Sequence, residues 1–333
     1  MKNYFKFNLT GNKLFPVWIL FLILYCVPYA IIQYKIQTLG KVHSTDMTEI
    51  MERSASMFKM YGISAILFIV EYSILFFIYK MAIEGIEFKE KTFRFVGKFG
   101  KFISLIIGNF LLTVITLGIY GPWFMTKMYK FFAENSKLDE QNPEFKGKGS
   151  DLFVIILVTL IIPMCVAMAL FMISAFIGGF VTAMKQADPS AMTPIMWVST
   201  VGFMVAILII MLPFIYYYYR WGVNFTFKGY EIKWNTEFWS SIGKIFVEIL
   251  LSVVTLGIYS PLASLRLYKY FAEKTVAKSE NGEKHFGYDI ESGDDFLYMW
   301  GQILLSIITL GIYCPWAMCK IGNRIFAKTY VEG

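Results

Sequence analysis

Residues 116–123 read TLGIYGPW, residues 255–262 read TLGIYSPL, and residues 309–316 read TLGIYCPW. Each copy closes a long apolar run and carries a proline two positions after its tyrosine. A proline cannot donate a backbone hydrogen bond in a helix interior, whereas it suits the first turn of a new helix. We therefore predict that each copy separates an apolar helix from a second helix. The residues predicted to break the helix are the glycine and the proline of each copy: Gly118, Pro122, Gly257, Pro261, Gly311 and Pro315.

The similarity among the three copies extends to both sides of the signature. A polar residue stands seven positions before each threonine: Asn109, Glu248 and Gln302. A basic residue stands five positions after each proline: Lys127, Arg266 and Lys320. We infer internal repeats near 93–137, 225–277 and 286–330, because chance does not produce three such copies. Together with helical hairpins at 14–82 and 151–219, they are expected to form one transmembrane domain over residues 1–333.

The rest of the sequence predicts a membrane protein. Of all residues, 57% are hydrophobic and 17% are charged, whereas soluble domains have roughly a quarter of charged residues. A bilayer-spanning helix needs about 20 mostly apolar residues. Seven runs meet this requirement: 14–32, 60–79, 102–126, 152–184, 189–219, 245–265 and 296–319. We predict an all-α, polytopic transmembrane bundle built from repeated helical hairpins.

A second motif precedes five of the apolar stretches. It consists of aromatic residues two positions apart, a glycine, and a further aromatic residue. The pairs or single aromatics that open it are Phe5 and Phe7, Phe93 and Phe95, Phe145, Phe225 and Phe227, and Phe286 and Tyr288. Together with the signature, this motif resembles the YjgN family of bacterial multi-pass inner-membrane proteins, the domain of unknown function 898. The resemblance covers nearly the whole chain and implies location in the bacterial inner membrane, but no established activity. Leu262 departs from it, since the other two copies have Trp123 and Trp316.

Two topologies remain open from the sequence. If each apolar run crosses once, seven spans result and the basic residues divide almost evenly between the two sides. If each segment after a proline returns, 20 of the 31 Lys and Arg residues lie on the N-terminal side and six on the return limbs. The remaining five are on the other side: Lys35, Lys41, Arg53, Lys59 and Lys185. Because basic loops are typically cytoplasmic, we favour the second topology, with both termini in the cytoplasm.

This topology has five hairpins: 14–34/59–82, 99–120/122–137, 151–184/190–219, 239–259/261–277 and 296–313/315–330. A return limb of about 16 residues reaches about 24 Å, which is less than the roughly 30 Å of the hydrocarbon core. We therefore expect the short limbs to be shielded or to enter the bilayer only in part. The segments expected on the N-terminal side are 138–150, 220–238, 278–294 and the C-terminus, whereas 36–57 and 185–190 are expected opposite.

Glu71 and Glu248 are the acids well inside predicted spans. Ionisable groups inside a membrane are costly and often mark transport pathways. Along its hairpin, Glu248 is expected at nearly the height of Lys269, with Arg266 as a second possible partner. Either a proton- or cation-responsive carboxylate faces a basic wall, or an ion pair fastens the hairpin. The complete candidate polar or transport site is Glu248, Glu71, Asn109, Gln302, Lys127, Arg266, Lys269 and Lys320.

The other members of this set also have two readings. Asn109 and Gln302 are expected to form hydrogen bonds between helices. The three basic residues after the prolines either form an anion site or extend to lipid headgroups.

Two classes of function follow from this set. The first is a transporter or channel for a small solute or ion, since broken helices and intramembrane carboxylates recur in carriers. The alternative is a scaffold or assembly factor that transports nothing, and from the sequence we favour transport. The sequence has no phosphate-binding loop, nucleophile–base pair or metal motif, so we expect no enzyme, cofactor or metal. The net charge of +7 is spread over the loops, so the expected partner is the lipid bilayer and not a nucleic acid.

Overall fold

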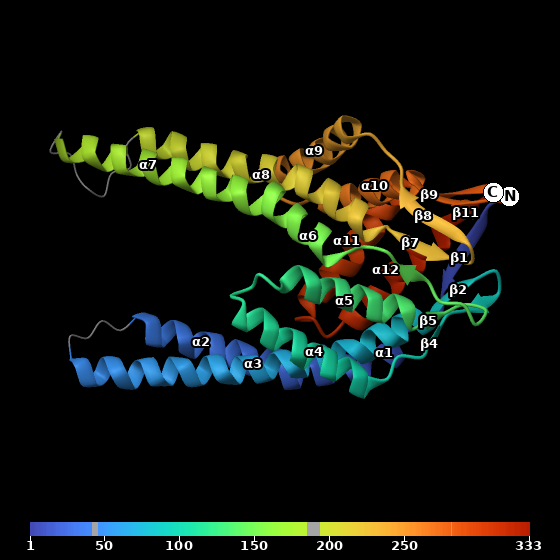
Figure 1. Cartoon of the computed structure of the whole chain (residues 1–333), viewed down its shortest axis with the longest axis horizontal. Coiled ribbons are helices and arrows are strands. Elements are labelled where there is room, and N and C mark those ends of the chain that lie inside the picture. Colours follow the sequence, from blue (N-terminus) through green and yellow to red (C-terminus); the bar gives the residue numbers. More distant parts are fainter. Residues whose placement is uncertain (42–45, 185–193, 281) are drawn as a thin grey trace. The chain divides into compact units, whose positions relative to one another are not determined.

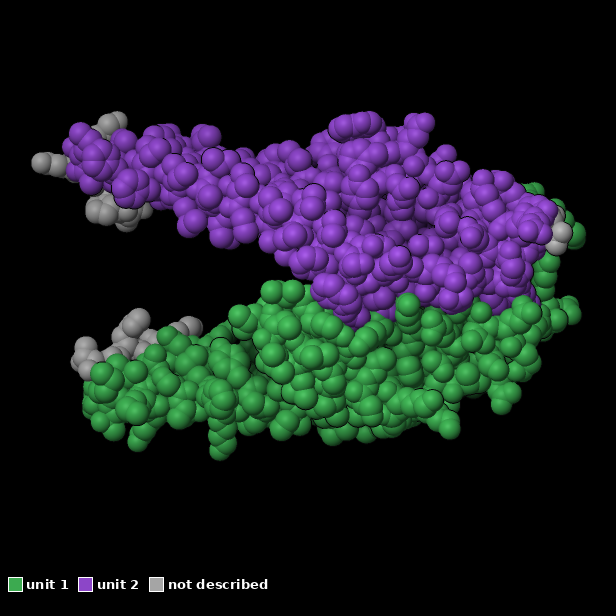
Figure 2. Space-filling model, in the orientation of Figure 1, with its two compact units in different colours: residues 1–120, 127–143, 287–333 green, residues 121–126, 144–286 purple. Residues whose placement is uncertain are grey.

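The computed structural model describes residues 1–41, 46–184, 194–280 and 282–333 (Figure 1). Within these residues the chain forms two compact units (Figure 2). Unit 1 comprises residues 1–120, 127–143 and 287–333, and unit 2 comprises residues 121–126 and 144–286. The predicted loop at 185–190, with Lys185, and part of the predicted loop at 36–57 lie outside the described residues.

Two pairs of long apolar helices confirm that this is a membrane protein. Four helices of the described residues are long and apolar enough to cross a bilayer: 11–40, 47–84, 149–184 and 194–222. In unit 1 they are built from α1 (Gly11–Phe21), η1 (Leu22–Cys26), α2 (Val27–Lys41) and α3 (Met47–Glu84). In unit 2 they are built from α6 (Gly149–Ile156), η2 (Leu157–Ile161), α7 (Ile162–Met184) and α8 (Pro194–Gly222). Figure 1 shows α7 and α8 side by side along their length.

The three signature runs form short helical hairpins. The first helix of each hairpin has 17 residues and the second has 14 or 15. These lengths are about 25 Å and 21 Å, so neither limb has the length of a full span. The hairpins are α4 (Phe99–Ile115) with α5 (Gly121–Glu134), α9 (Phe238–Val254) with α10 (Ser260–Glu273), and α11 (Ser292–Ile308) with α12 (Cys314–Lys328).

The chain leaves helical geometry at all three predicted breaks. In the first hairpin, Leu117 has a φ of 50° and Gly118 a φ of 91°. This left-handed region suits glycine, because a side chain there is strained. The proline lies in the first turn of the second helix in every copy. The left-handed residues therefore end the first helix, and the proline begins the second.

Antiparallel strands accompany the helices, so the all-α prediction is wrong in part. In unit 1 the strand order is β3 (Lys91–Thr92), β2 (Ile86–Phe88), β1 (Asn3–Phe7) and β11 (Thr329–Glu332), and β4 (Arg94–Phe95) pairs with β5 (Ser136–Lys137). In unit 2 the order is β10 (Gly282–Tyr288), β9 (Thr275–Ser279), β8 (Tyr230–Trp234), β7 (Phe225–Phe227) and β6 (Glu144–Phe145). The aromatic residues that open the second motif lie in these strands, except Phe93, which lies between β3 and β4. Aromatic residues that alternate with polar ones are typical of a strand.

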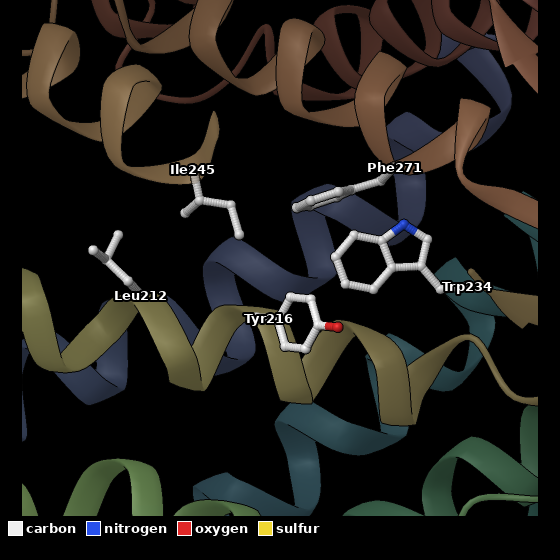
Figure 3. Packing of buried hydrophobic residues seen from close by; sticks show 5 residues of the cluster. All are labelled: Leu212, Tyr216, Trp234, Ile245 and Phe271. Carbon is white, nitrogen blue, oxygen red and sulfur yellow. The ribbon is translucent and has the colours of Figure 1, made fainter. Parts of the chain in front are cut away.

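In each unit, an aromatic residue of a strand packs against a long helix. In unit 2, Trp234 of β8 packs with Tyr216 of α8 and Phe271 of α10 (Figure 3). In unit 1, Phe76 of α3 contacts Phe95 of β4, with ring centroids 5.7 Å apart. The hydrophobic core thus lies where strand, hairpin and long helix meet.

The two ends of the chain lie in adjacent strands. Asn3 of β1 is opposite Val331 of β11, and Phe5 of β1 is opposite Phe88 of β2. The first strand, the segment after α3 and the last strand are therefore on one side of the long helices of unit 1.

Candidate functional site

A tyrosine joins the two helices of each short hairpin. In the first hairpin, the Tyr120 hydroxyl donates to Asn109 Oδ1 at 3.1 Å and accepts from Lys127 Nζ at 2.8 Å. The other two hairpins have the same arrangement: Tyr259 with Glu248 at 2.9 Å and Arg266 at 2.7 Å, and Tyr313 with Gln302 at 2.9 Å and Lys320 at 2.9 Å. We call each set of three residues a tyrosine bridge.

The geometry of the hairpin explains why these three positions meet. Asn109 lies six residues before α4 ends at Ile115, and Lys127 lies six residues after α5 begins at Gly121. Both are therefore about 9 Å from the turn. The backbone N–H of Tyr120 donates to Thr116 Oγ1 at 3.0 Å, which fixes the start of the second helix. The Tyr120 side chain then extends from the turn to the level of its two partners.

Each tyrosine bridge has one residue from the first helix of its hairpin, and of these three residues Glu248 is the one that can ionise. Its side chain is 1% exposed, and its Oε1 accepts from Lys244 Nζ at 2.7 Å. Its Oε2 accepts from the Tyr259 hydroxyl, which in turn accepts from Arg266. Both carboxylate oxygens are therefore bonded, and two cations lie within the same network.

The predicted pairing of Glu248 with Lys269 is wrong. Lys269 instead forms an ion pair with Glu273 at 3.7 Å, and both side chains are well exposed. The two residues are not level, because Glu248 lies six residues before α9 ends at Val254, whereas Lys269 lies nine residues after α10 begins at Ser260. Counted from the true helix ends, the residue level with Glu248 is Arg266.

Glu71 stands apart from the tyrosine bridges. It lies on α3 and interacts with Tyr25 of η1 across the long helix pair of unit 1. The eight predicted residues therefore divide into three bridges, one surface ion pair that contains Lys269, and the Glu71–Tyr25 contact.

The sequence reasoning missed the bridging tyrosines and a second buried acid, Asp295. The tyrosine signal was present, because each one stands eleven residues after the polar residue and seven before the basic one. Asp295 is 1% exposed and accepts hydrogen bonds from Arg324 Nε at 2.5 Å and Lys328 Nζ at 2.7 Å. Burial opposes ionisation of Asp295, but the bonds from Lys328 and Arg324 outweigh it and hold its pKa below the ordinary value.

Asp295 occupies a position that recurs in the other two hairpins with different chemistry. It stands seven residues before Gln302, as Phe102 does before Asn109 and Ser241 before Glu248. Phe102 packs on Phe131 with ring centroids 5.2 Å apart, and Ser241 Oγ lies 2.9 Å from the Tyr270 hydroxyl. At the foot of each hairpin, the end opposite its turn, the two helices are thus joined by a different contact: an apolar one in the first hairpin, a hydrogen bond in the second and an ion pair in the third.

Two of the hairpins also pack closely on the start of a long helix. A Cβ atom added to Gly11 of α1 would lie 2.8 Å from the Trp316 Cα, and one added to Gly149 of α6 would lie 3.0 Å from the Trp123 Cα. These are the two copies whose proline is followed by tryptophan. Leu262 takes this place in α10.

We expect the tyrosine bridges to differ in their contribution to stability. Tyr259→Phe should lower the free energy of unfolding by about 2 kcal/mol, because hydrogen bonds to charged groups contribute roughly 1.5–3 kcal/mol. Tyr120→Phe and Tyr313→Phe should each cost about 1 kcal/mol, since their acceptors are neutral amides and the lysines that donate to them, Lys127 and Lys320, are exposed to water. Thermal unfolding of the purified protein in detergent micelles would measure the three losses. Equal losses would contradict a special contribution from the Glu248 carboxylate.

Comparison with known proteins gives matches in one family. The family described as "Bacterial protein of unknown function (DUF898)" matches residues 90–154 and 122–289. The chain is 44% identical over 71 residues to the inner membrane protein YjgN of Salmonella typhimurium (strain LT2), a match that covers 21% of this chain and 18% of that protein. It is 31% identical over 72 residues to the inner membrane protein YjgN of Escherichia coli (strain K12), covering 22% and 18%. These matches span less than a fifth of each relative, and no solved structure is significantly similar.

Proposed function

Because the chain belongs to the DUF898 family of bacterial proteins and is similar to proteins named inner membrane protein YjgN, we propose that it is a multi-pass scaffold of the inner membrane. The carrying observation is that the polar groups inside the three hairpins bind one another. Asn109, Gln302 and Glu248 are each bonded to a tyrosine of their own hairpin. Polar groups that are hydrogen-bonded to one another in this way hold helices together.

The proposed arrangement has two crossing helix pairs and three hairpins that enter the bilayer in part. The pairs are α1–α2 with α3, and α6–α7 with α8. Pairing of β1 with β11 supports an even number of crossings, because seven crossings would separate the two ends of the chain. The excess of basic residues on the strand side supports a cytoplasmic location for both ends.

The hairpin of α11 and α12 supports partial entry. Trp18 Nε1 donates to the Gly311 carbonyl at 2.9 Å, so the turn lies beside Trp18. Trp18 is seven residues, about 10 Å, from the start of α1 at Gly11. The spanning helix that begins there has 30 residues, or about 45 Å. The turn therefore reaches about a quarter of the way along it.

Cysteine labelling tests this arrangement. In a background without Cys26, Cys165, Cys314 and Cys319, single cysteines would replace Lys89, Lys228, Glu332 and Ser56 in turn. A membrane-impermeant maleimide applied to intact cells should label the Ser56 position and leave the other three unlabelled until the membrane is opened. Labelling of the Glu332 position in intact cells would reject the proposed arrangement, and so would protection of the Ser56 position.

Transport is a second candidate, and the Glu248 carboxylate is the observation that favours it. The equivalent positions hold neutral residues that form the same bond to tyrosine, so the bridge itself does not require a charge. Under the scaffold proposal, Glu248→Gln should fold and cost at most about 1–2 kcal/mol, because glutamine accepts from tyrosine in the third hairpin.

Uptake into liposomes, driven by pH or ion gradients across a metabolite panel, separates the two candidates. We expect no uptake by either the wild type or Glu248→Gln. Uptake by the wild type that is lost in Glu248→Gln, but retained in a Gln302→Glu control, would replace the scaffold with a coupled transporter.

A further inference from the structure

The turns of the three hairpins expose their largest apolar side chains. Leu117 and Leu256 are 93% exposed and Leu310 is 89% exposed. The isoleucine two positions later is more than half exposed in each copy. No charged residue occurs between Lys101 and Lys127, so the first turn lies at the centre of an uncharged segment. Such a surface is favourable against hydrocarbon and unfavourable in water.

The backbone of these turns is also suited to hydrocarbon. Every N–H of the pentapeptide 116–120 donates within its own hairpin: residue 116 to Leu112, 117 to Val114, 118 to Thr113, and 119 to the Thr116 carbonyl. The fifth, from Tyr120, goes to Thr116 Oγ1. The same five bonds occur in 255–259 and 309–313. An unpaired donor would cost several kcal/mol in lipid, so these bonds remove the donors' part of the cost of inserting a turn.

A basic residue stands at a constant height below each turn. Lys127, Arg266 and Lys320 each follow their bridging tyrosine by seven residues, which is about 10 Å along the helix. In the α11–α12 hairpin, Trp316 packs on Gly11 at the start of α1, and Lys320 lies four residues, about 6 Å, further from the turn. The next turn of α12 is level with β1, because Gly322 lies close to Phe7. Lys320 is therefore just outside the start of the spanning helix, which is the level of the headgroups in the proposed arrangement.

These basic side chains retain donors after their bonds to tyrosine. Lys127 and Lys320 are exposed, and each gives one hydrogen bond to a tyrosine hydroxyl. An ammonium group has three donors and a guanidinium has five. The tyrosine holds each cation in place while its other N–H groups remain able to bind an anion at the membrane surface.

We propose that the three turns insert by about 10 Å into the cytoplasmic leaflet, and that Lys127, Arg266 and Lys320 bind the phosphate groups of anionic phospholipids around the inserted turns. This inference rests on the proposed membrane arrangement and adds the lipid ligand to it. Insertion explains why the turn is uncharged, why its backbone N–H groups are all hydrogen-bonded, and why a tyrosine binds the cation below it.

The depth of the turns is measured with a fluorescent probe. In the cysteine-free full-length protein, an environment-sensitive dye would be attached at position 117, 256 or 310 in liposomes that contain phosphatidylglycerol. We expect strong quenching by lipids that carry a spin label near acyl carbon 5, weaker quenching by a label near carbon 12, and none by aqueous iodide. A dye at Ser56 is the exposed control, and one at Met172 in α7 is the deep control.

Iodide quenching at all three turns would overturn the inference, as would quenching strongest at the bilayer centre. If cysteine labelling still reports the expected sides, only the insertion of the turns has failed. If the labelled sides are reversed, the proposed arrangement itself has failed.

The phosphate contact is tested by lipid selectivity. The variant Lys127→Gln, Arg266→Gln, Lys320→Gln should lose its preference for phosphatidylglycerol over phosphatidylcholine by roughly fivefold per removed cation, since a basic residue at the surface contributes about 1 kcal/mol. Binding of spin-labelled lipids to the purified protein in mixed micelles measures this preference. The matched control Lys89→Gln, Lys146→Gln, Lys233→Gln removes the same charge in or next to the strands β2, β6 and β8 and should keep the preference.

Equal loss in the two variants would overturn the specific contact and leave only a general charge effect. If the first variant does not fold, Lys127→Gln with Lys320→Gln leaves the Glu248 network intact and should lose the preference in part. An unchanged preference in that folded double variant would also reject the contact.

Discussion

Replacing Asp295 with alanine is expected to lower the free energy of unfolding by about 3 kcal/mol. Asp295 is buried, and Arg324 and Lys328 both donate to it. Removing one partner of a buried ion pair typically costs about 3–5 kcal/mol, because the remaining charge is left without compensation. Glu291 lies 3.0 Å from Lys328 and remains, which places the expectation at the lower end. Thermal or denaturant unfolding in detergent micelles would measure it.

Two controls separate the ion pair from other effects. Asp294 is exposed beside it in the same turn of α11, so Asp294→Ala should change stability by less than about 0.5 kcal/mol. Equal losses from the two alanine variants would contradict a buried network at Asp295.

The dependence of stability on pH gives a second control. The pKa of Asp295 is lowered on folding from an ordinary value of 3.8, so its stabilisation is complete above that value and is lost as the pH falls through the lower folded value. Asp295→Asn should lack this part of the acid dependence.

Placing a single methyl group on Gly11 or Gly149 is expected to have the second large effect. Gly11→Ala and Gly149→Ala should each cost about 2–3 kcal/mol, since the new Cβ would overlap backbone atoms of Trp316 or Trp123 and overpacking costs roughly 1–3 kcal/mol. A backbone atom cannot move aside as the end of a side chain can, so the hairpin must separate from the long helix.

The matched control is Gly100→Ala in α4, where an added Cβ meets open space. Alanine is favoured over glycine in a helix by about 1 kcal/mol, so Gly100→Ala should stabilise slightly. In detergent micelles, the unfolding temperature should fall for Gly11→Ala and Gly149→Ala and rise for Gly100→Ala. Stabilisation by Gly11→Ala would contradict the close contact of α1 with Trp316.

The sequence predicted the helices well and the strands not at all. The helices could be predicted because charge-free runs and prolines are local signals. The predicted limb 99–120, for example, contains α4, which ends at Ile115. The strands have only two to seven residues, and their partners are far apart in the chain. Phe5 of β1, for example, is opposite Phe88. The aromatic motif was visible in the sequence. Which strands pair with one another, however, depends on tertiary structure, and a local pattern does not determine it.

The residues of the candidate site were predicted in part, but the way they connect was not. Arg266 was named as a possible partner of Glu248, and the structure joins them through Tyr259. The sequence reasoning had already used this tyrosine to mark the helix break, so its hydroxyl was overlooked. Asp295 escaped notice because it directly precedes the apolar run that begins at residue 296. Burial at the foot of a hairpin depends on residues such as Lys328, which arrive 33 positions later.

The pairing of β1 with β11 has a consequence for the order of synthesis. The first strand and α1 emerge from the ribosome well before their partners β11 and α12, which follow more than 270 residues later. Unit 1 therefore cannot complete its sheet, or pack Trp316 on Gly11, until α12 and β11 have been translated. Until then, one edge of β1 remains open for pairing with another chain. A nascent chain arrested before residue 314 should consequently be a substrate for chaperones or membrane proteases, whereas a chain that includes residues 314–332 should not.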